Sequence, residues 1–419
     1  MRTCKIIIVI LAIMLGVNNY TTAQRNYTQE ADDAFKLEQY NVSIDLYKKA
    51  YTKVKQNRAE KNRILFQIAE AYRMMNNTKN SEIAYKRVIK TNYFKQEPKV
   101  YLYLADALRA NQKYDEALEN YQNYLKLVPG DQKALNGVES CKKVNEWLSK
   151  PTRYEVTNMK RWNTRDNEWS PMFTDRKKYS ELVYTTTGAG VTGKGEDAWT
   201  GMNFSDFFVV TQDRKGNWDA PQLFDKDLMI NTEANEGEAS FNENGSVIYF
   251  TRCPIEKKKR LGCQIYTSKK KGKGWDEPEL VDLGSEDYDY VHPAISPDEL
   301  TIYFASNMPN GYGEFDIWVA KRDKKTKPFG KPENLGPNIN TAGKEMFPTL
   351  RYDTALYFSS NGHIGFGGYD IYKSSKVNGE WTPAMNMGSP INSYADEMGM
   401  TFYPESEKGF FSSNRKEGR

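Results

Sequence analysis

A glycine-rich stretch comes closest to a pattern that could do chemistry. Residues 188–195 read Gly-Ala-Gly-Val-Thr-Gly-Lys-Gly, which matches most of a phosphate-binding loop. Such a loop needs a hydroxyl residue after its lysine, and a helix whose N-terminus faces the phosphate must follow at once. Here Gly195 takes the hydroxyl position, and the next regular run is the β-type stretch 207–210. The sequence therefore favours a long hairpin loop over a nucleotide site, and it predicts no cofactor.

Few residues could serve as catalytic or metal-binding histidines, because the chain contains only His292 and His363. A Ser-His-Asp site needs a histidine beside a nucleophile, and no Gly-x-Ser-x-Gly motif occurs. A zinc site needs three or four ligands, and these two histidines belong to different repeats. His292 precedes a proline in a β-type run, and His363 lies in a glycine-rich segment. We predict structural or solvated roles for both, no catalytic residue and no metal site.

Two aspartates, Asp316 and Asp370, occupy equivalent places in neighbouring repeats. They could belong to a ring of carboxylates that binds Ca²⁺, or each could accept hydrogen bonds within its own hairpin. Recurrence in each repeat favours the second interpretation, because repeated turns need repeated turn residues. The basic run 256–260 is interpreted as a solvated loop, with contact to an acidic partner as the alternative.

The elements that hold these residues come from a stranded repeat in the second part of the chain. A Tyr-Phe-type pair ends one β-rich run in each unit, and an aromatic residue followed by proline closes the unit. The pairs begin at Tyr184, Tyr249, Tyr303, Tyr357 and Phe410. Repeats of this length, with several short strands each, are typical of propeller blades.

The preceding part of the chain repeats with a helical period. Small residues at Ala31, Ala69 and Ala105 are each followed by a tyrosine, at Tyr47, Tyr85 and Tyr121 respectively. Further small residues lie between them, so two helices per unit can cross closely while the tyrosine fills the space below. The stretch after Asp131 is predicted to form a helix that caps the last open apolar face.

The chain begins with a typical export signal. A positively charged start precedes an apolar run and small residues suited to cleavage, so residues 1–23 are predicted to be a signal peptide. The apolar run is too short for a stable membrane span, and no other long one exists, so no transmembrane span is expected in the mature chain. The net charge of only +4 argues against nucleic acid as a partner. Cys4 precedes the apolar run, which argues against a lipid anchor.

Two of the remaining cysteines could pair. Cys253 and Cys263 bracket a basic loop between two predicted strands of one hairpin. In an oxidising compartment a disulfide between them is plausible, and the alternative is two buried free thiols. Cys141 is expected to be a core residue on a helix.

Both repeats resemble known families. The segment from Ala105 to Gly130 resembles a tetratricopeptide (TPR) repeat, and the stranded units resemble PD40 repeats, the WD40-like units found in the TolB propeller. The expected fold is therefore multidomain α plus all-β. An N-terminal tetratricopeptide α-solenoid with a capping helix covers residues 26–149, and a β-propeller covers 152–419. By this resemblance we expect six blades and a propeller that is incomplete at the C-terminus.

The order of signal peptide, TPR repeats and PD40 propeller is similar to that of PorE-like, OmpA-family cell-envelope proteins associated with type IX secretion. The resemblance implies a non-enzymatic periplasmic scaffold or adaptor, associated with the outer membrane. Its envelope protein partners would bind the TPR groove and the propeller face. Peptidoglycan would be bound only through domains that are not in this sequence.

Two other functions remain as alternatives. A periplasmic hydrolase or lyase would have a polar site in the central channel of the propeller. A glycan-binding module would use exposed aromatic side chains as stacking platforms, with Trp162, Trp169 and Trp199 as candidates.

Overall fold

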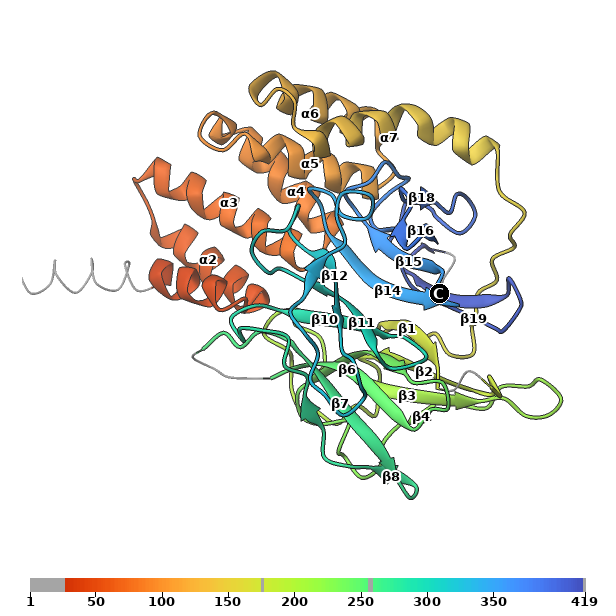
Figure 1. The fold of residues 1–419 in the computed structure, drawn as a ribbon. Helices are drawn as coiled ribbons and strands as arrows, with labels where there is room; N and C mark the ends of the chain where they lie inside the picture. The colour runs from red at the N-terminus through yellow and green to blue at the C-terminus, as the bar shows by residue number, and fades with distance from the viewer. Residues whose placement is uncertain (1–26, 175–176, 255–258, 417–419) are drawn as a thin grey trace, which may run out of the picture. The chain divides into compact units, whose positions relative to one another are not determined.

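The structure is a computed structural model, and it describes residues 27–174, 177–254 and 259–416. These residues form two compact units, which are described separately below (Figure 1). The first unit runs to Ala107 and includes Asp197–Gly201 and the described part of Lys258–Arg260. The second unit holds the rest of the chain. The predicted signal peptide, residues 1–23, and most of the basic run 256–260 lie outside the described residues.

The first unit is built from helices that follow one another as antiparallel pairs. A helix over residues 27–36 is followed by α2 (Tyr40–Lys53), α3 (Arg58–Met74) and α4 (Thr78–Ile89). A short 3₁₀ turn, η1 (Tyr93–Lys95), leads to α5 (Lys99–Ala110), which continues into the second unit. Helices α3 and α4 each begin at an asparagine whose side chain accepts a backbone N–H of the first turn, which is the usual way to satisfy such groups.

The small residues and tyrosines of the helical repeat form the core of this unit. Ala31 and Ala69 are fully buried, and so is Tyr85, while Tyr47 is 1% exposed. A buried tyrosine needs a partner for its hydroxyl, and Tyr47 donates to Asp32 at 2.5 Å. The guanidinium group of Arg63 holds the same carboxylate through two bonds of 2.9 and 3.0 Å. The repeated tyrosine therefore combines packing with one specified polar contact.

The second unit begins with a helical hairpin, α6 (Tyr114–Leu127) and α7 (Gln132–Ser149). Asp131 caps α7 by accepting from the Ala134 N–H at 2.9 Å. Gly137 on α7 lies against the ring of Tyr121, so closely that an added Cβ would come within 2.4 Å of it. The capping helix predicted after Asp131 is thus present, and a glycine lets it approach the last tyrosine of the repeat.

The rest of the second unit consists of antiparallel sheets arranged as propeller blades (Figure 1). Blade 1 contains β1 (Glu168–Phe173), β2 (Glu181–Thr186), β3 (Asp206–Thr211) and β4 (Gln222–Leu223). Blade 2 contains β5 (Asn235–Phe241), β6 (Val247–Cys253), β7 (Gln264–Lys271), β8 (Gly274–Trp275) and β9 (Glu279–Leu280). Blade 3 contains β10 (Tyr290–Ile295), β11 (Thr301–Ser306), β12 (Asp316–Lys321) and β13 (Glu333–Asn334). Blade 4 contains β14 (Glu345–Arg351), β15 (Ala355–Ser360), β16 (Asp370–Val377), β17 (Glu380–Trp381) and β18 (Met385–Asn386).

A fifth sheet has two described strands, β19 (Glu397–Phe402) and β20 (Gly409–Ser413). The first strand of each sheet lies next to the first strand of the following sheet, and β19 lies against both β14 and β1. Phe173 of β1 packs on Tyr403 and Phe410, which belong to this fifth sheet. The expectation of six blades is not confirmed, because the described residues give four blades and this two-stranded sheet.

The apolar cores lie between blades. One core joins Ile248 and Phe250 of blade 2 to Val183 and Phe207 of blade 1, and similar cores join the other neighbours. A single blade leaves both faces apolar, so each is stable only against its neighbours. This is why the Tyr-Phe pairs recur: the two residues point to opposite faces of their strand, and one serves each interface.

Helix α7 packs on the loop between β15 and β16 within the second unit. Asn136 donates to the Gly362 carbonyl at 2.9 Å, and the Gly365 N–H donates to the hydroxyl of Ser140 at 3.0 Å. The rings of Trp147 and Phe366 lie 5.2 Å apart. Helices α6 and α7, predicted as part of the helical domain, therefore share a compact unit with the sheets.

Candidate functional site

The most regular polar feature of the propeller is a buried glutamate at the start of the inner strands. Glu236, Glu345 and Glu397 occupy the same register position, and each follows an Asn-Thr or Asn-Ser pair. In blade 2, Thr232 donates its N–H at 3.0 Å and its hydroxyl at 2.6 Å to the two oxygens of Glu236. The same two bonds recur at Glu345 and Glu397. The pattern Asn-(Thr/Ser)-x-x-x-Glu was visible in the sequence and was missed.

The asparagine of this pattern joins one blade to the preceding one. Asn340 accepts from the Ile317 N–H at 2.8 Å and donates to the Ile317 carbonyl at 3.0 Å. Asn231 and Asn392 bind Phe207 and Ile371 in the same way. Each asparagine side chain thus makes the two backbone hydrogen bonds that an adjacent strand would make with the third strand of the preceding blade.

Two of the three glutamates have an arginine partner. Arg252 binds Glu236 at 2.8 Å and Arg415 binds Glu397 at 2.9 Å, and each also donates to a backbone carbonyl of the preceding loop. In blade 4, His363 takes over the carbonyl contact by binding the Ile339 oxygen at 2.8 Å. Glu345 has hydroxyl and N–H donors there, including Ser360 at 2.6 Å, but forms no ion pair with any residue that the structure describes.

Burial governs the ionisation of these groups. Desolvation raises the pKa of Glu345 to about 7, against the lowering effect of its Ser360 and Thr341 hydrogen bonds. Desolvation likewise raises the pKa of Glu236 to about 7, although Arg252 opposes it. Burial also lowers the pKa of His363, so this ring is neutral near neutral pH. These carboxyl groups are structural, because every oxygen is used inside its own blade.

A second ring of residues lies further along the inner strands. One residue in each inner strand sits at a β-bulge with a φ between 50° and 56°, in the left-handed region. These five residues, which we call the inner ring, are Ser170, Glu238, His292, Phe347 and Gly399. Only Gly399 was expected to favour that conformation from its residue type. Because such backbone geometry is costly and clusters at functional sites, the inner ring is the place to look for chemistry.

Hydroxyl groups from the adjacent blade hold this ring in place. The N–H of Ser170 donates to Ser412, that of Glu238 to Thr185 and that of His292 to Thr251, at 2.9–3.3 Å. Thr251 and Ser412 directly follow the pairs that begin at Tyr249 and Phe410, and Thr185 directly follows Tyr184. The equivalent residue in blade 3 is Ala305, which has no hydroxyl.

His292 replaces the missing hydroxyl group. Its Nδ1 accepts the Phe347 N–H at 3.4 Å, and its ring stacks on that of Phe347 with the centroids 3.9 Å apart. Desolvation lowers the pKa of His292 to about 3, which keeps Nδ1 unprotonated and able to accept. The geometry therefore gives His292 a packing role, with its acceptor nitrogen already used.

Glu238 is the one inner-ring residue that could do chemistry. It is 3% exposed, its Oε2 has no hydrogen-bond partner in the structure, and the hydroxyl of Ser170 is likewise unpartnered. Desolvation raises the pKa of Glu238 to about 8, so the carboxyl group is protonated at neutral pH. A glycosidase needs two carboxyl groups across the bond it cleaves, and Glu238 is the only carboxyl group in the inner ring.

The other sequence candidates have structural places. The stretch 188–195 lies in the loop between β2 and β3 with no helix after it, and the Thr192 N–H donates to Asp206. Asp316 accepts from the Tyr312 and Gly313 N–H groups, and Asp370 accepts from the Phe366 N–H at 2.5 Å. Both aspartates therefore bind their own loops. Across residues 27–174, 177–254 and 259–416, no three His, Cys, Asp or Glu side chains come together in a way that could hold a metal ion.

The proposed glycan platforms are not free surfaces. Trp162 is 6% exposed and packs between Trp218 and Phe410, which corrects the expectation that it is exposed. Trp199 is half-buried and packs edge-on against Tyr40, 5.3 Å away. Trp169 is half-buried on β1. A sugar cannot stack on Trp162, because neighbouring rings cover it.

Cys253 and Cys263 are bonded to each other in the structure, with their Cα atoms 4.1 Å apart, and Cys141 is a buried free thiol. The bond closes the loop between β6 and β7, part of which lies outside the described residues. Whether the two thiols pair in solution depends on the compartment, so the disulfide stays a prediction.

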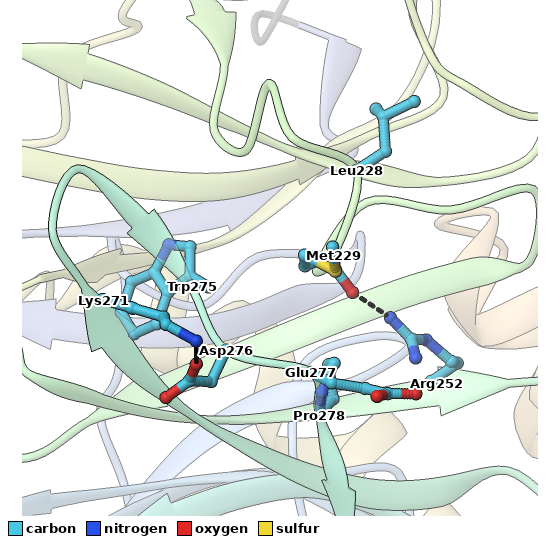
Figure 2. Close-up of a pocket in the computed structure, with 8 residues that line it drawn as sticks. All are labelled: Leu228, Met229, Arg252, Lys271, Trp275, Asp276, Glu277 and Pro278. Atoms are coloured by element: carbon cyan, nitrogen blue, oxygen red, sulfur yellow. Dashed lines mark hydrogen bonds and ion pairs between the residues drawn. The ribbon is translucent and has the colours of Figure 1, made fainter.

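An open pocket of about 700 Å³ lies beside the loop between β4 and β5 (Figure 2). Asn231 follows Leu223 by eight residues, whereas Asn340 follows the equivalent Asn334 by six, so this loop is two residues longer than its counterpart. Arg252 holds the loop through the Met229 carbonyl at 2.9 Å. The lining residues are Leu228, Met229, Arg252, Lys271, Trp275, Asp276, Glu277 and Pro278. Lys271 pairs with Asp276 at 2.9 Å.

The raised pKa of Glu345 predicts a pH-dependent stability. Its pKa is 4.5 when unfolded and about 7 when folded, so the folded state holds a proton that the unfolded chain releases. Stability is therefore highest below about pH 4.5 for this group, and on the order of 3 kcal/mol is lost as the pH rises to about 7. We expect Glu345→Gln to remove this part of the pH dependence, because the amide can still accept from the Thr341 N–H. Urea unfolding at several pH values measures it.

Glu236→Gln is the matched comparison for that variant. It removes a carboxyl group whose folded pKa is likewise about 7, so it should remove a similar pH dependence. It also leaves the guanidinium of Arg252 without its carboxylate, so we expect a further loss of about 3–5 kcal/mol. Equal pH profiles for Glu345→Gln and the wild type would contradict the assignment.

The role of His292 predicts that one substitution can restore stability that another removes. His292→Phe keeps a ring against Phe347 but removes the acceptor for its N–H, so we expect a loss of about 1–3 kcal/mol. Adding Ala305→Ser supplies the hydroxyl that the other blades carry, and should recover part of that loss. Chemical denaturation of the single and double variants measures both effects. If Ala305→Ser lowers stability by the same amount in the wild type and in His292→Phe, His292 does not replace a missing hydroxyl acceptor.

Comparison with known proteins gives one family match. Residues 98–131 match the family model of the tetratricopeptide repeat. This segment contains α5 and α6, so the TPR part of the expected fold is shown. No curated protein matches the chain in sequence. No helix in the described part of the chain is long and apolar enough to cross a membrane.

Several solved structures are similar to the chain at low identity. A putative TolB from Agrobacterium tumefaciens is 14% identical, with 61% of this chain and 93% of that chain covered and a TM-score of 0.34. A puromycin-hydrolyzing peptidase of Mycobacterium tuberculosis is 13% identical, with 56% and 33% covered and a TM-score of 0.33. A thermostable family-43 glycoside hydrolase is 12% identical, with 56% and 100% covered and a TM-score of 0.32. The chain thus spans a third of the peptidase's length, and likenesses this remote carry no argument about function. What is shown is a chain with TPR helices followed by propeller sheets.

Proposed function

We propose that the protein is a non-enzymatic scaffold or adaptor that binds other proteins in a cell-envelope complex. The observation that supports this best is that side chains suited to chemistry are occupied in packing. His292 and His363 accept from or bind backbone groups, and Asp316 and Asp370 hold their own loops. The chain instead offers surfaces: helical repeats, which typically bind a peptide or helix of a partner, and the rigid disc of a propeller.

The location and process follow from the resemblance given above. We propose export to the periplasm on the basis of the predicted signal peptide, and association with the outer membrane. Type IX secretion is the process that we propose, with envelope proteins as partners. Binding to peptidoglycan would require domains beyond this sequence.

A periplasmic hydrolase or lyase is the second candidate, and Glu238 is the observation that favours it. A buried carboxyl group with a raised pKa and an unpartnered oxygen is the form that a general acid takes. Against it stands the composition of the inner ring, in which Ser170, His292, Phe347 and Gly399 provide no second carboxyl group.

Cross-linking of the tagged protein in living cells, followed by purification from envelope extracts, tests the scaffold. We expect stoichiometric recovery of at least one envelope protein, and the same recovery with Glu238→Gln. An unrelated periplasmic protein with the same tag is the control. Recovery of the protein only as a free monomer would contradict the scaffold. A hydrolytic activity on envelope glycans or peptides that Glu238→Gln abolishes would favour the enzyme instead.

A further inference from the structure

The two ends of the propeller sheets differ in what they carry. In an antiparallel blade the turn between strands one and two lies at the same end as the hairpin between strands three and four. We call this end the hairpin face, and the end with the loops between strands two and three the loop face. Helix α7 binds the loop face, since Asn136 and Ser140 contact Gly362 and Gly365 between β15 and β16. Within the second unit, the chain's own helices therefore bind the end opposite to the hairpin face.

Contacts between blades show that the hairpin face is continuous. Asn242, in the first turn of blade 2, donates to Glu299 in the first turn of blade 3 at 2.9 Å. Arg322, in the outer hairpin of blade 3, donates to the Glu299 carbonyl at 2.8 Å and to the Tyr249 hydroxyl of blade 2 at 2.9 Å. In blade 4, the hydroxyl of Tyr352 accepts an N–H from the turn of the fifth sheet.

Lysines gather on this face at the outer hairpins of blades 2 and 3. Residues 269–273 read Lys-Lys-Lys-Gly-Lys, and residues 321–327 read Lys-Arg-Asp-Lys-Lys-Thr-Lys. Two of these lysines have ion pairs, Lys271 with Asp276 and Lys325 with Glu299. Exposed lysines for which no ion pair is found are Lys269, Lys270, Lys273, Lys321, Lys324 and Lys327. The two hairpins thus carry nine cationic side chains and one anionic one, Asp323.

Apolar side chains protrude from the same face in blade 4. Tyr352, in the first turn, is 56% exposed, and Val377, at the outer hairpin, is 54% exposed. A tyrosine and an aliphatic residue beside a group of lysines is a combination that suits the boundary between lipid headgroups and acyl chains. Lysine binds phosphate as a mobile point charge, so it suits a surface of moving headgroups better than one fixed anion.

We propose that the hairpin face binds the surface of a membrane that contains anionic phospholipids. The lysines of blades 2 and 3 would contact the phosphate groups, while Tyr352 and Val377 would insert at the headgroup level. Bound in this way, the propeller would present its loop face away from the lipid. Acidic residues on the same face limit the strength of binding: Glu243 and Asp298 lie in the first turns of blades 2 and 3, and Glu380 pairs in register with Val377 at the outer hairpin of blade 4.

The competing explanation for the lysines is protection of sheet edges. Exposed lysines on an outer strand prevent edge-to-edge pairing with other chains. That role accounts for one exposed lysine near the end of the third strand of a blade, such as Lys270 in blade 2 and its equivalent Lys376 in blade 4. It does not account for the further lysines of blades 2 and 3, because the hairpin residues 377–380 of blade 4 contain no lysine. The concentration of lysines on two adjacent blades therefore points to a surface with one preferred side.

Co-sedimentation of the mature protein with vesicles tests the proposal. We expect binding to vesicles of phosphatidylcholine with phosphatidylglycerol, and none to phosphatidylcholine alone. Changing Lys269, Lys273, Lys324 and Lys327 together to Gln should weaken binding about tenfold or more. The wild-type affinity should also fall as the salt concentration rises. Val377→Ser should weaken binding without changing its salt dependence.

The matched control changes Lys49, Lys55, Lys90 and Lys142 to Gln, which removes the same charge from exposed positions in or beside the helices. This variant should bind as the wild type does. Equal loss in both quadruple variants would overturn the proposal, since net charge alone would then explain the binding. Equal binding to neutral vesicles, or no binding to either kind, would overturn it as well. None of these outcomes bears on the scaffold proposal, which concerns protein partners.

Discussion

The contact between neighbouring blades is the constraint on which the propeller depends. Each blade has two apolar faces and cannot bury them alone, so the sheets must pack in a ring. Asparagine side chains secure that ring by pairing with backbone groups of the adjacent blade, as Asn340 does with Ile317. Hydroxyl groups repeat the arrangement at the inner ring, where Thr185 binds the Glu238 N–H. Such contacts fix the angle between blades as well as their order.

The buried glutamates show that this arrangement has a cost in desolvation free energy. Removing a carboxylate from water raises its pKa, and the blades offset the cost with hydroxyl groups, N–H groups and, in two cases, arginine. Blade 4 lacks the arginine and has His363 at the carbonyl contact instead. The same loop forms the surface that α7 packs on, through Gly362 and Gly365. Blade 4 therefore departs from the repeated contacts in the same loop on which α7 packs.

The features of the chain that could contact other molecules lie mainly on its surfaces. The inner ring is filled by packed residues, and among those described only Ser170 and Glu238 have an unpartnered side-chain oxygen there. The loop face is used in part by α7, while the hairpin face carries lysines and protruding apolar side chains. A protein built in this way suits the role of holding other molecules at defined positions.

The sequence by itself determined the kinds of element and their order. Small residues and tyrosines at a helical period predicted the helices, and the Tyr-Phe pairs predicted the strands, because side-chain periodicity reflects local backbone geometry. It also indicated the role that the structure gives Asp370, since repeated residues usually serve the repeat. Tertiary structure alone decided which residues meet: the inner ring, the role of His292 opposite Ala305, the burial of Trp162, and the closure between β19 and β1. These depend on contacts between segments far apart in the chain, and no local pattern encodes such distances.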